Sequence, residues 1–435
     1  MKGLLFVYAM TYGGSVVALF RPFYGVLIYL AFACLRPEYL WYWSVTPGNY
    51  SRIVALATLA GWAVAGFGNW KLGPARPILL TLLAYWAWII VSALFAANQA
   101  VAWDYVVLHS KILGPVVVGM TLIHEVRQLQ QIAWVIVACL GYLALQGNLD
   151  YLAGGTQVRE YGFASMDNNS FCIAIVTGAC VAFFLGLAET VWWRRLIAFA
   201  AAALMAHVPM FAASRGGMLG LIVAGGVSFV VLPKRPAFLA AWLLALIVGI
   251  RLAGPQVVER FSTIFASAED RDDSAQSRLD LWADCWDVML KHPVTGAGPD
   301  HWPLLASSYG WPPGKEAHSL WFNAGAELGF VGVGLLLGLY GLTSYKNWRL
   351  ARDPRLDDPW LQTAGRMVIT SLAAYCVSAS FVALDALEVP YYVLLLGAGA
   401  VSVAARQPAH MAIHVEAEDA PLAEATAHSP VSSIP

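Results

Sequence analysis

The chain carries little charge. Only 12% of its 435 residues are Asp, Glu, Lys or Arg, and the formal net charge at pH 7 is −1. Soluble globular proteins contain about 25% of these residues, so the composition excludes an ordinary water-soluble domain. A net charge this close to zero also provides no broad basic field for a polyanion. We therefore expect no nucleic-acid partner.

Cysteine pairs and cofactor motifs are also missing. Five of the six cysteines lie in apolar segments, namely Cys34, Cys139, Cys172, Cys180 and Cys376. This distribution excludes a disulfide framework, and no CxxC spacing indicates a metal site. A Walker loop, a GxGxxG turn and an HExxH motif are likewise absent. We predict no metal and no cofactor, so the energy for any reaction must come with the substrate or from a gradient.

Apolar residues are abundant at 59%, and 18 of the residues are tryptophan. They form repeated runs of about 17–25 residues, the length that crosses the hydrocarbon core of a bilayer as a helix. The fold class predicted is an all-α polytopic membrane protein of about 12 transmembrane helices. The predicted spans are 3–20, 22–36, 51–68, 76–97, 104–123, 128–147, 168–190, 195–213, 216–232, 237–253, 319–343, 365–384 and 389–404. Only Arg21 and Pro22 separate the first two, which are either two short spans or one broken span.

Basic residues alternate between the loops and so predict the topology. The basic loops contain Lys71 and Arg76, Arg127, Arg194 and Arg195, Lys234 and Arg235, and Lys346, Arg349, Arg352 and Arg355. The positive-inside rule places these loops in the cytoplasm. Alternation then places 98–103, 148–167, 214–216, 254–318 and 385–388 on the periplasmic side of a bacterial inner membrane.

Four regions follow from this pattern. An N-terminal transmembrane bundle (1–253) precedes a large periplasmic loop domain with amphipathic helices (254–318), between the tenth and eleventh apolar segments. C-terminal transmembrane helices (319–405) come next. The last residues (406–435) lack periodicity and are predicted to be a disordered cytoplasmic tail.

The large loop contains a predicted amphipathic helix. Ser277 is a suitable N-cap for a helix from Arg278 to about Lys291, with Pro293 just beyond its end. Four apolar residues recur at helical spacing and predict one apolar face: Leu279, Trp282, Trp286 and Met289. Such a helix suits a membrane interface or a lid over a cavity.

His318 is the candidate general base. It comes directly before a long apolar helix, and an imidazole titrates near neutral pH. Alternatively, it is a helix-end residue at the headgroup level, above a Gly325–Gly329 packing face.

Two arginines are candidates for an anionic ligand, because a guanidinium binds two oxygens at once. Arg215 lies at a turn between two apolar runs, followed by two glycines and a helix N-terminus that suits a phosphate. Arg278 begins the loop helix, where a cation is unfavourable to the helix dipole. The alternatives are a snorkelling role for Arg215 and pairing of Arg278 with nearby acids.

Other residues on the outer side are weaker candidates for substrate binding: Arg52, Arg159, Tyr161, Asn168, Arg260, Asp385 and Glu388. Within the membrane, Glu327 is expected to form a structural ion pair with a residue such as Lys111.

Three motifs together resemble the O-antigen ligase superfamily. They are the arginine turn SRGGMLGL, the loop segment RLDLWADCWDVMLKHPVTGAGPDHW, and a His-Ser-glycine motif. In this last motif, nine residues separate the pair His318-Ser319 from Gly329, and two more separate Gly329 from Gly332. The resemblance covers roughly residues 160–340. At the N-terminus, RPFYGVLIYLAFACLRPEYL is similar to a subgroup described as O-glycosylation ligases.

The resemblance implies transfer of a glycan from undecaprenyl diphosphate to an acceptor at the periplasmic face, with membrane lipids around the enzyme. In the ligase proper, the acceptor is the lipid A–core oligosaccharide. Arg215 and Arg278 would bind the diphosphate, and His318 would accept the acceptor proton. The superfamily also contains Wzy-type polymerases and protein O-oligosaccharyltransferases, which these motifs do not separate.

A preorganised pair of cations would make a metal unnecessary, and a single displacement would invert the anomeric carbon. The alternative from another class is a secondary transporter of small anions, with Arg215, Lys111 and Glu327 lining its path. That alternative predicts paired broken helices, which the sequence does not show, and it leaves the large outer loop unexplained.

Overall fold

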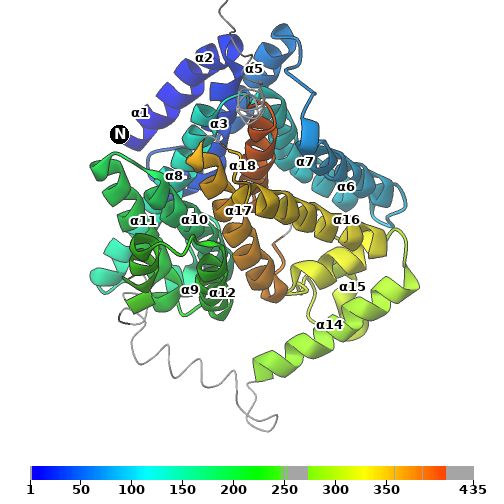
Figure 1. The fold of residues 1–435 in the computed structure, drawn as a ribbon. Coiled ribbons are helices and arrows are strands. Elements are labelled where there is room, and N and C mark those ends of the chain that lie inside the picture. The colour runs from blue at the N-terminus through cyan, green and yellow to red at the C-terminus, as the bar shows by residue number, and fades with distance from the viewer. Residues whose placement is uncertain are drawn as a thin grey trace, which may run out of the picture.

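The structure is a computed structural model that describes residues 2–244, 246–247, 251, 273–356, 358–384 and 386–407. Within these ranges all the regular elements are helices, joined by loops and turns, and there is no β-strand (Figure 1). Arg260, Asp385 and the predicted tail beyond 407 lie outside the described residues.

The predicted apolar segments are helices wherever the structure describes them in full. Their bounds are α1 (Lys2–Tyr8), a π-helical turn η1 (Ala9–Gly13), α2 (Gly14–Phe20), α3 (Pro22–Leu35), α4 (Pro37–Leu40), α5 (Tyr50–Val64), η2 (Gly73–Ala75), α6 (Arg76–Leu94), α7 (Gln99–Leu122), α8 (Val126–Leu152), α9 (Gln157–Tyr161), α10 (Asn168–Ala188), α11 (Trp192–Phe211), α12 (Arg215–Val231), α14 (Asp273–Lys291), α15 (Trp302–Leu305), η5 (Ala306–Tyr309), α16 (Leu320–Ala351), α17 (Pro359–Ser378), η6 (Ala379–Phe381) and α18 (Val389–Ala404).

Nine helices in the described part of the chain are long and apolar enough to cross a membrane, and three shorter apolar helices accompany them. Lys2–Phe20 and Pro22–Leu40 are separate candidates. These lengths and compositions support a multi-pass membrane protein.

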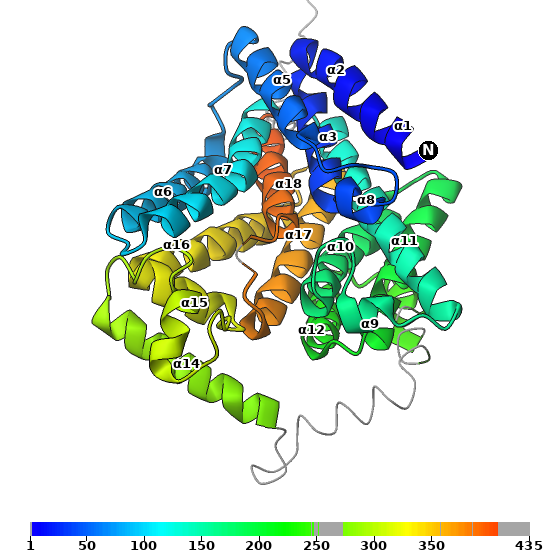
Figure 2. The same ribbon diagram turned by 180° about the vertical axis from the view of Figure 1, so that it is seen from behind.

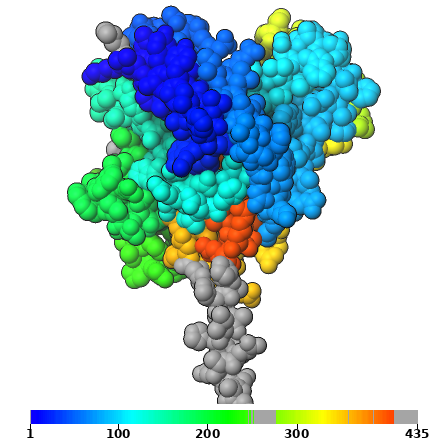
Figure 3. Space-filling model, turned by 90° about the horizontal axis from the view of Figure 1, so that it is seen from above, coloured from blue at the N-terminus to red at the C-terminus, as the bar shows by residue number. Residues whose placement is uncertain are grey.

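Helices α10 and α18 form the centre of the bundle, because most of their side chains are buried and none is exposed. Helix α10 packs against α8, α11, α12 and α17. Helices α1 and α2 lie on the outer surface of the bundle, where Figure 3 shows them in dark blue. An apolar helix with an exposed apolar side is expected where lipid replaces water.

Polar contacts tie together loops that are far apart in the sequence. Arg406 donates hydrogen bonds to the carbonyl oxygens of Ile123 (3.3 Å) and Lys71 (3.4 Å). In another cluster, Arg36 contacts Glu388 and the carbonyl of Ser165. The first cluster contains loops that the basic-residue pattern assigns to the cytoplasm, and the second contains loops that it assigns to the periplasm.

The region around α14 and α15 has a small hydrophobic core of its own and lies to one side of the bundle (Figures 1 and 2). Its buried residues are Leu281, Cys285, Val288, Trp302, Ala306, Ala317 and Ala326. Ala326 belongs to α16, so the first part of that helix packs in this small core rather than only in the bundle.

The prediction for the loop helix was partly wrong. Helix α14 begins at Asp273, so Ser277 lies inside it and is not its N-cap. Of the predicted apolar face, Met289 is buried and Trp282 half-buried, whereas Leu279 and Trp286 are exposed. Two partly exposed acids of α14 bind the segment that follows it. The carboxylates of Asp284 and Asp287 accept hydrogen bonds from Trp311 Nε1 (2.7 Å) and the Tyr309 hydroxyl (2.6 Å).

Helix α16 is interrupted at Gly329, which has φ 69° and ψ −173°. The interruption frees carbonyl groups of α16 for partners outside the helix. The carbonyls of Ala326 and Glu327 accept from the backbone N–H groups of Ala297 (2.8 Å) and Gly298 (3.0 Å). The Leu328 carbonyl accepts from Trp88 Nε1 at 2.9 Å. The break therefore joins the loop domain to the membrane helices through the backbone.

Glu327 has different partners from the one expected. Its carboxylate accepts from the backbone N–H of Trp302 (3.4 Å) and from Asn323 Nδ2 (3.2 Å). Lys111 lies elsewhere on α7, where its carbonyl accepts from the Tyr29 hydroxyl. The predicted Glu327–Lys111 ion pair is therefore wrong, because the interrupted helix turns Glu327 toward the loop domain.

We predict that Gly329→Ala destabilises the protein. The backbone conformation at Gly329 is nearly restricted to glycine and would cost an alanine about 1–3 kcal/mol. A Cβ atom there would also overlap the carbonyl oxygen of Val294. The apparent Tm in detergent should fall by several degrees.

Gly334→Ala is the matched control, because a Cβ at Gly334 meets nothing within 4 Å. Its Tm should remain the same or rise slightly, since alanine is the better helix former. Equal Tm values for the two variants would contradict a structural role for the break.

Candidate functional site

A cavity of about 250 Å³ lies where α10, α12, α14 and η6, which follows α17, meet. Its lining residues are Asn168, Asn169, Ala213, Arg215, Gly216, Arg278, Phe381 and Val382. The structure thus brings together three of the predicted site residues, Arg215, Arg278 and Asn168, from separate parts of the chain.

Arg215 is the first residue of α12, and its turn is held by hydrogen bonds. Ser214 caps the helix: its hydroxyl accepts from the backbone N–H of Gly217 (3.3 Å) and donates to Asn169 Oδ1 (2.8 Å). Ala213, just before the cap, has a left-handed φ of 56°. A helix N-terminus combined with a guanidinium is a suitable environment for an anion.

Asn168 and Asn169 begin α10, which Asp167 caps through the backbone N–H groups of Asn169 and Ser170. The side-chain amide of Asn168 donates to the carbonyls of Arg159 (3.0 Å) and Ala212 (2.9 Å). It therefore fixes the outer loop against the end of α11. Asn169 was missed from the sequence, because adjacent asparagines offered no means of choosing between them.

Arg278 lies one helical turn before Trp282 on α14. The Trp282 indole N–H donates to the carbonyl of Ala317 at 3.0 Å, and its ring stacks on Phe322 at 5.2 Å with an interplanar angle of 12°. The same ring lies 6.2 Å from the ring of Phe381, which lines the cavity. Trp282 thus connects the arginine helix to the segment that carries His318.

His318 follows Ala317 and lies just before Ser319, the residue that precedes α16. Its backbone has a left-handed φ of 49°, which is uncommon for a residue with a side chain. The ring is half-buried, and no described residue forms a hydrogen bond with it. It is not among the lining residues of the cavity, but the charges of Arg278 and Asp167 both influence its ionisation.

The pKa of His318 lies below its ordinary value of 6.5. Burial is the largest cause, followed by the positive charges of Lys315 and Arg278, while Asp167 acts in the opposite direction. Each of these cations disfavours a second positive charge on the imidazole. The ring is therefore neutral at pH 7 and able to accept a proton.

The structure does not bring the other described candidates into the cavity. Tyr161 is 74% exposed and the side chain of Arg159 is also exposed, although the Arg159 carbonyl contacts Asn168. Arg52 is exposed on α5, which lies at the top of Figures 1 and 2, whereas α12 and α14 lie at the bottom.

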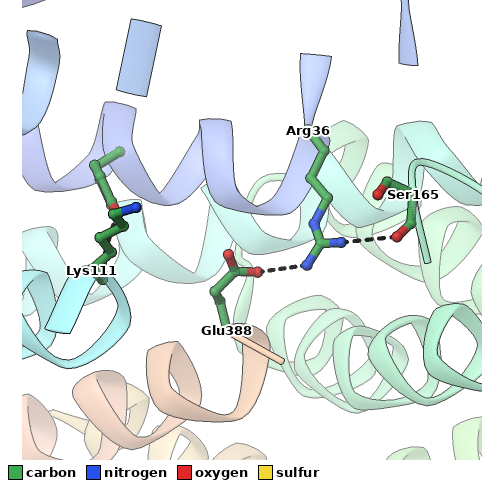
Figure 4. A network of polar contacts seen from close by, with 5 residues as sticks. Arg36, Lys111, Ser165 and Glu388 are labelled. Atoms are coloured by element: carbon green, nitrogen blue, oxygen red, sulfur yellow. Dashed lines mark hydrogen bonds and ion pairs between the residues drawn. The ribbon is translucent and has the colours of Figure 1, made fainter. Parts of the chain in front are cut away.

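Glu388, the last described candidate, is in an ion pair outside the cavity. Arg36 Nη2 donates to Glu388 Oε2 at 3.2 Å, and Arg36 Nη1 donates to the carbonyl of Ser165 at 3.3 Å (Figure 4). Ser165 is two residues before Asp167, which caps the helix that begins at the cavity. The ion pair therefore fixes α3 and α18 to the loop that leads into the site.

This arrangement suits the binding of a multiply charged anion next to a proton acceptor. Two guanidinium groups, a helix N-terminus and side-chain amides provide donors for several oxygens. The described residues contain no group of three or more His, Cys, Asp or Glu side chains placed to hold a metal ion. The sequence indicated the arginines and the histidine, but offered no signal for Phe381 or Val382.

Two family matches cover most of the chain. Residues 1–191 match a family of unknown function (DUF5935), and residues 200–337 match the O-antigen ligase family. A search of curated proteins found no match. The second match contains Arg215, Arg278 and His318, the residues on which the resemblance was first based. The match over residues 200–337 supports the assignment of this region to the O-antigen ligase family, in the ligase and polymerase superfamily.

Proposed function

We propose that this protein is a bacterial inner-membrane O-antigen ligase. It transfers a glycan from undecaprenyl diphosphate to the lipid A–core oligosaccharide at the periplasmic face. The observation that carries this proposal is the cavity shared by Arg215 and Arg278, together with the charge of Arg278 within electrostatic reach of a neutral His318.

The reaction is a single displacement. The acceptor hydroxyl oxygen attacks the anomeric carbon and forms the new glycosidic bond, while His318 takes the hydroxyl proton. The bond between the anomeric carbon and the diphosphate oxygen breaks, and undecaprenyl diphosphate leaves with the electron pair. Arg215 and Arg278 stabilise the negative charge that develops on the leaving group. One displacement inverts the configuration at the anomeric carbon.

Wzy-type polymerisation and protein O-glycosylation use the same donor chemistry with another acceptor, and no contact in the cavity favours either of them. A transporter of small anions has weaker support. Its path would need Arg215, Lys111 and Glu327 together, but Glu327 contacts the loop domain and Lys111 lies elsewhere on α7.

The predicted sidedness is supported by contacts between loops. The contacts of Arg36 with Ser165 and Glu388 join loops that the positive-inside rule assigns to the periplasm. The contacts of Arg406 with Lys71 and Ile123 join loops that the rule assigns to the cytoplasm. A periplasmic cavity would meet a lipid-linked donor that has already crossed the membrane.

The first prediction of the proposal concerns sidedness. Ser307→Cys, at an exposed loop position, should react with an impermeant thiol reagent in intact spheroplasts. Arg355→Cys, exposed between α16 and α17, should react only after lysis. Reversed accessibility would exclude a periplasmic site.

The second prediction concerns the base. His318→Ala should lower the single-turnover rate roughly 10²–10⁴-fold, the usual contribution of a general base. Binding of the donor should change little, because the two arginines remain. The assay is transfer from undecaprenyl-diphosphate glycan in nanodiscs, with donor binding measured separately.

The pH profile of the same reaction should report the protonation of the His318 ring. The rate depends on the neutral ring, so it should stay constant above pH 6.5 and fall as the pH drops through the lowered pKa. Lys315→Gln removes a charge that lowers this pKa and should move the inflection upward. Lys291→Gln removes a similar charge that does not act on His318 and should leave it in place. Identical profiles for all three proteins would argue against His318 as the base.

The third prediction separates binding from proton transfer. Arg215→Ala and Arg278→Ala should each weaken donor binding, because a charge-assisted contact contributes about 1.5–3 kcal/mol. Lysine at either position should restore only part of the loss, since ammonium lacks the two-pronged geometry. Arg127→Ala, exposed at the start of α8, is the control and should bind normally. Unchanged donor binding in both cavity variants would show that the anion lies elsewhere.

A further inference from the structure

Helix α14 has an apolar stripe on its outer side. Leu279 and Trp286 are each 45% exposed, Leu290 is 55% exposed, and Val294, just after the helix, is 56% exposed. Residues 279, 286 and 290 follow helical spacing, so they lie on one side of α14. The buried side of the helix faces the small core instead. A stripe of this kind normally has an apolar partner.

The stripe continues onto the exposed side of α16. The ring of Trp286 lies 5.6 Å from that of Phe330, edge to face at 87°. Phe330 follows the break at Gly329, and the exposed apolar residues beyond it are Val331, Leu337 and Tyr345. The exposed apolar surface of a membrane helix contacts lipid.

The length of α16 indicates where the membrane ends. The segment after the break runs from Phe330 to Ala351, and at 1.5 Å per residue it is about 33 Å long. That length matches the roughly 30 Å hydrocarbon core. Phe330 therefore lies near the boundary between hydrocarbon and headgroups, and so does the tryptophan that it contacts. Tryptophan is enriched at this boundary.

We infer that the outer stripe of α14, formed by Leu279, Trp286, Leu290 and Val294, rests on the lipid surface of the bilayer. The helix lies in the interface with its inner side on the loop domain, as amphipathic surface helices do. This inference deepens the proposed function, because Arg278 adjoins Leu279 at the cavity end of the stripe. The stripe holds Arg278 at headgroup depth, where the phosphates of a lipid-linked diphosphate lie.

Labelling tests this contact without any enzymatic assay. Trp286→Cys and Leu290→Cys carry an environment-sensitive fluorophore in nanodiscs, in a Cys376→Ser background because the other native cysteines are buried. Spin-labelled lipid should quench both positions, whereas aqueous iodide should not. Ser307→Cys, an exposed position elsewhere in the loop domain, is the control and should show the opposite pattern.

Two results would overturn the inference. Quenching of both stripe positions by iodide, as at residue 307, would show that the stripe faces water. Alternatively, neither iodide nor spin-labelled lipid could quench the fluorophores at the two stripe positions. If that protection disappeared when each nanodisc held one copy, a second copy of the chain would be the partner of the stripe.

A functional measurement then links the stripe to Arg278. Leu290→Glu should raise the KM for a bilayer-embedded donor roughly three- to tenfold by weakening the interfacial contact, with kcat nearly unchanged. Ser307→Glu introduces the same charge away from the stripe and should keep the normal KM. If the quenching result holds but neither variant transfers glycan, the proposed function fails and the membrane contact stands. If transfer is normal and KM unaffected by Leu290→Glu, the stripe does not position Arg278.

Discussion

The backbone pairing at the break in α16 is the constraint on which the rest of the site depends. Gly329 adopts a conformation that is nearly exclusive to glycine, and the carbonyls it frees accept N–H groups from Ala297 and Gly298. Phe330 N–H donates to the carbonyl of Pro293 at 2.9 Å, which completes the junction. Backbone groups near the membrane must be satisfied within the protein. These contacts therefore fix the loop domain, and with it Arg278 and His318, against the bundle that carries Arg215.

The junction also gives Gly329, the first glycine of the His-Ser motif, a structural explanation. A Cβ atom at Gly329 would overlap the backbone of Val294, and one at Gly296 would overlap the backbone of Glu327. The nine residues between Ser319 and Gly329 form a piece of helix that packs on two sides. Ala326 lies in the small core of the loop domain, whereas Leu320, Ala324 and Leu328 lie in the core of the bundle. His318 therefore precedes a helix that joins the loop domain to the bundle.

The sequence predicted helices well and contacts poorly. A run of about 20 apolar residues has one stable conformation in a bilayer, so segments such as α10 and α18 matched within a few residues. Gly329 was not expected to interrupt α16, because a glycine is also compatible with a continuous membrane helix. The face of α14 was predicted wrongly because the helix has apolar residues on two sides. Leu281, Cys285 and Val288 face the small core, whereas Leu279 and Trp286 lie on the exposed side, and hydrophobic periodicity does not separate the two sets. The Arg36–Glu388 pair joins opposite ends of the chain and had no local signal.

The charges around His318 combine two requirements that usually conflict. In the proposed function Arg278 attracts an anionic donor, yet its charge also lowers the pKa of the imidazole and so makes it a weaker base. A bound diphosphate would neutralise part of that positive field. The pKa of His318 would then rise, and the ring would become a stronger proton acceptor once the donor is in place. In the proposed reaction, Arg278 would keep the base weak in the empty site, and the bound diphosphate would strengthen it in the loaded one. Proton abstraction would then be coupled to the presence of the donor.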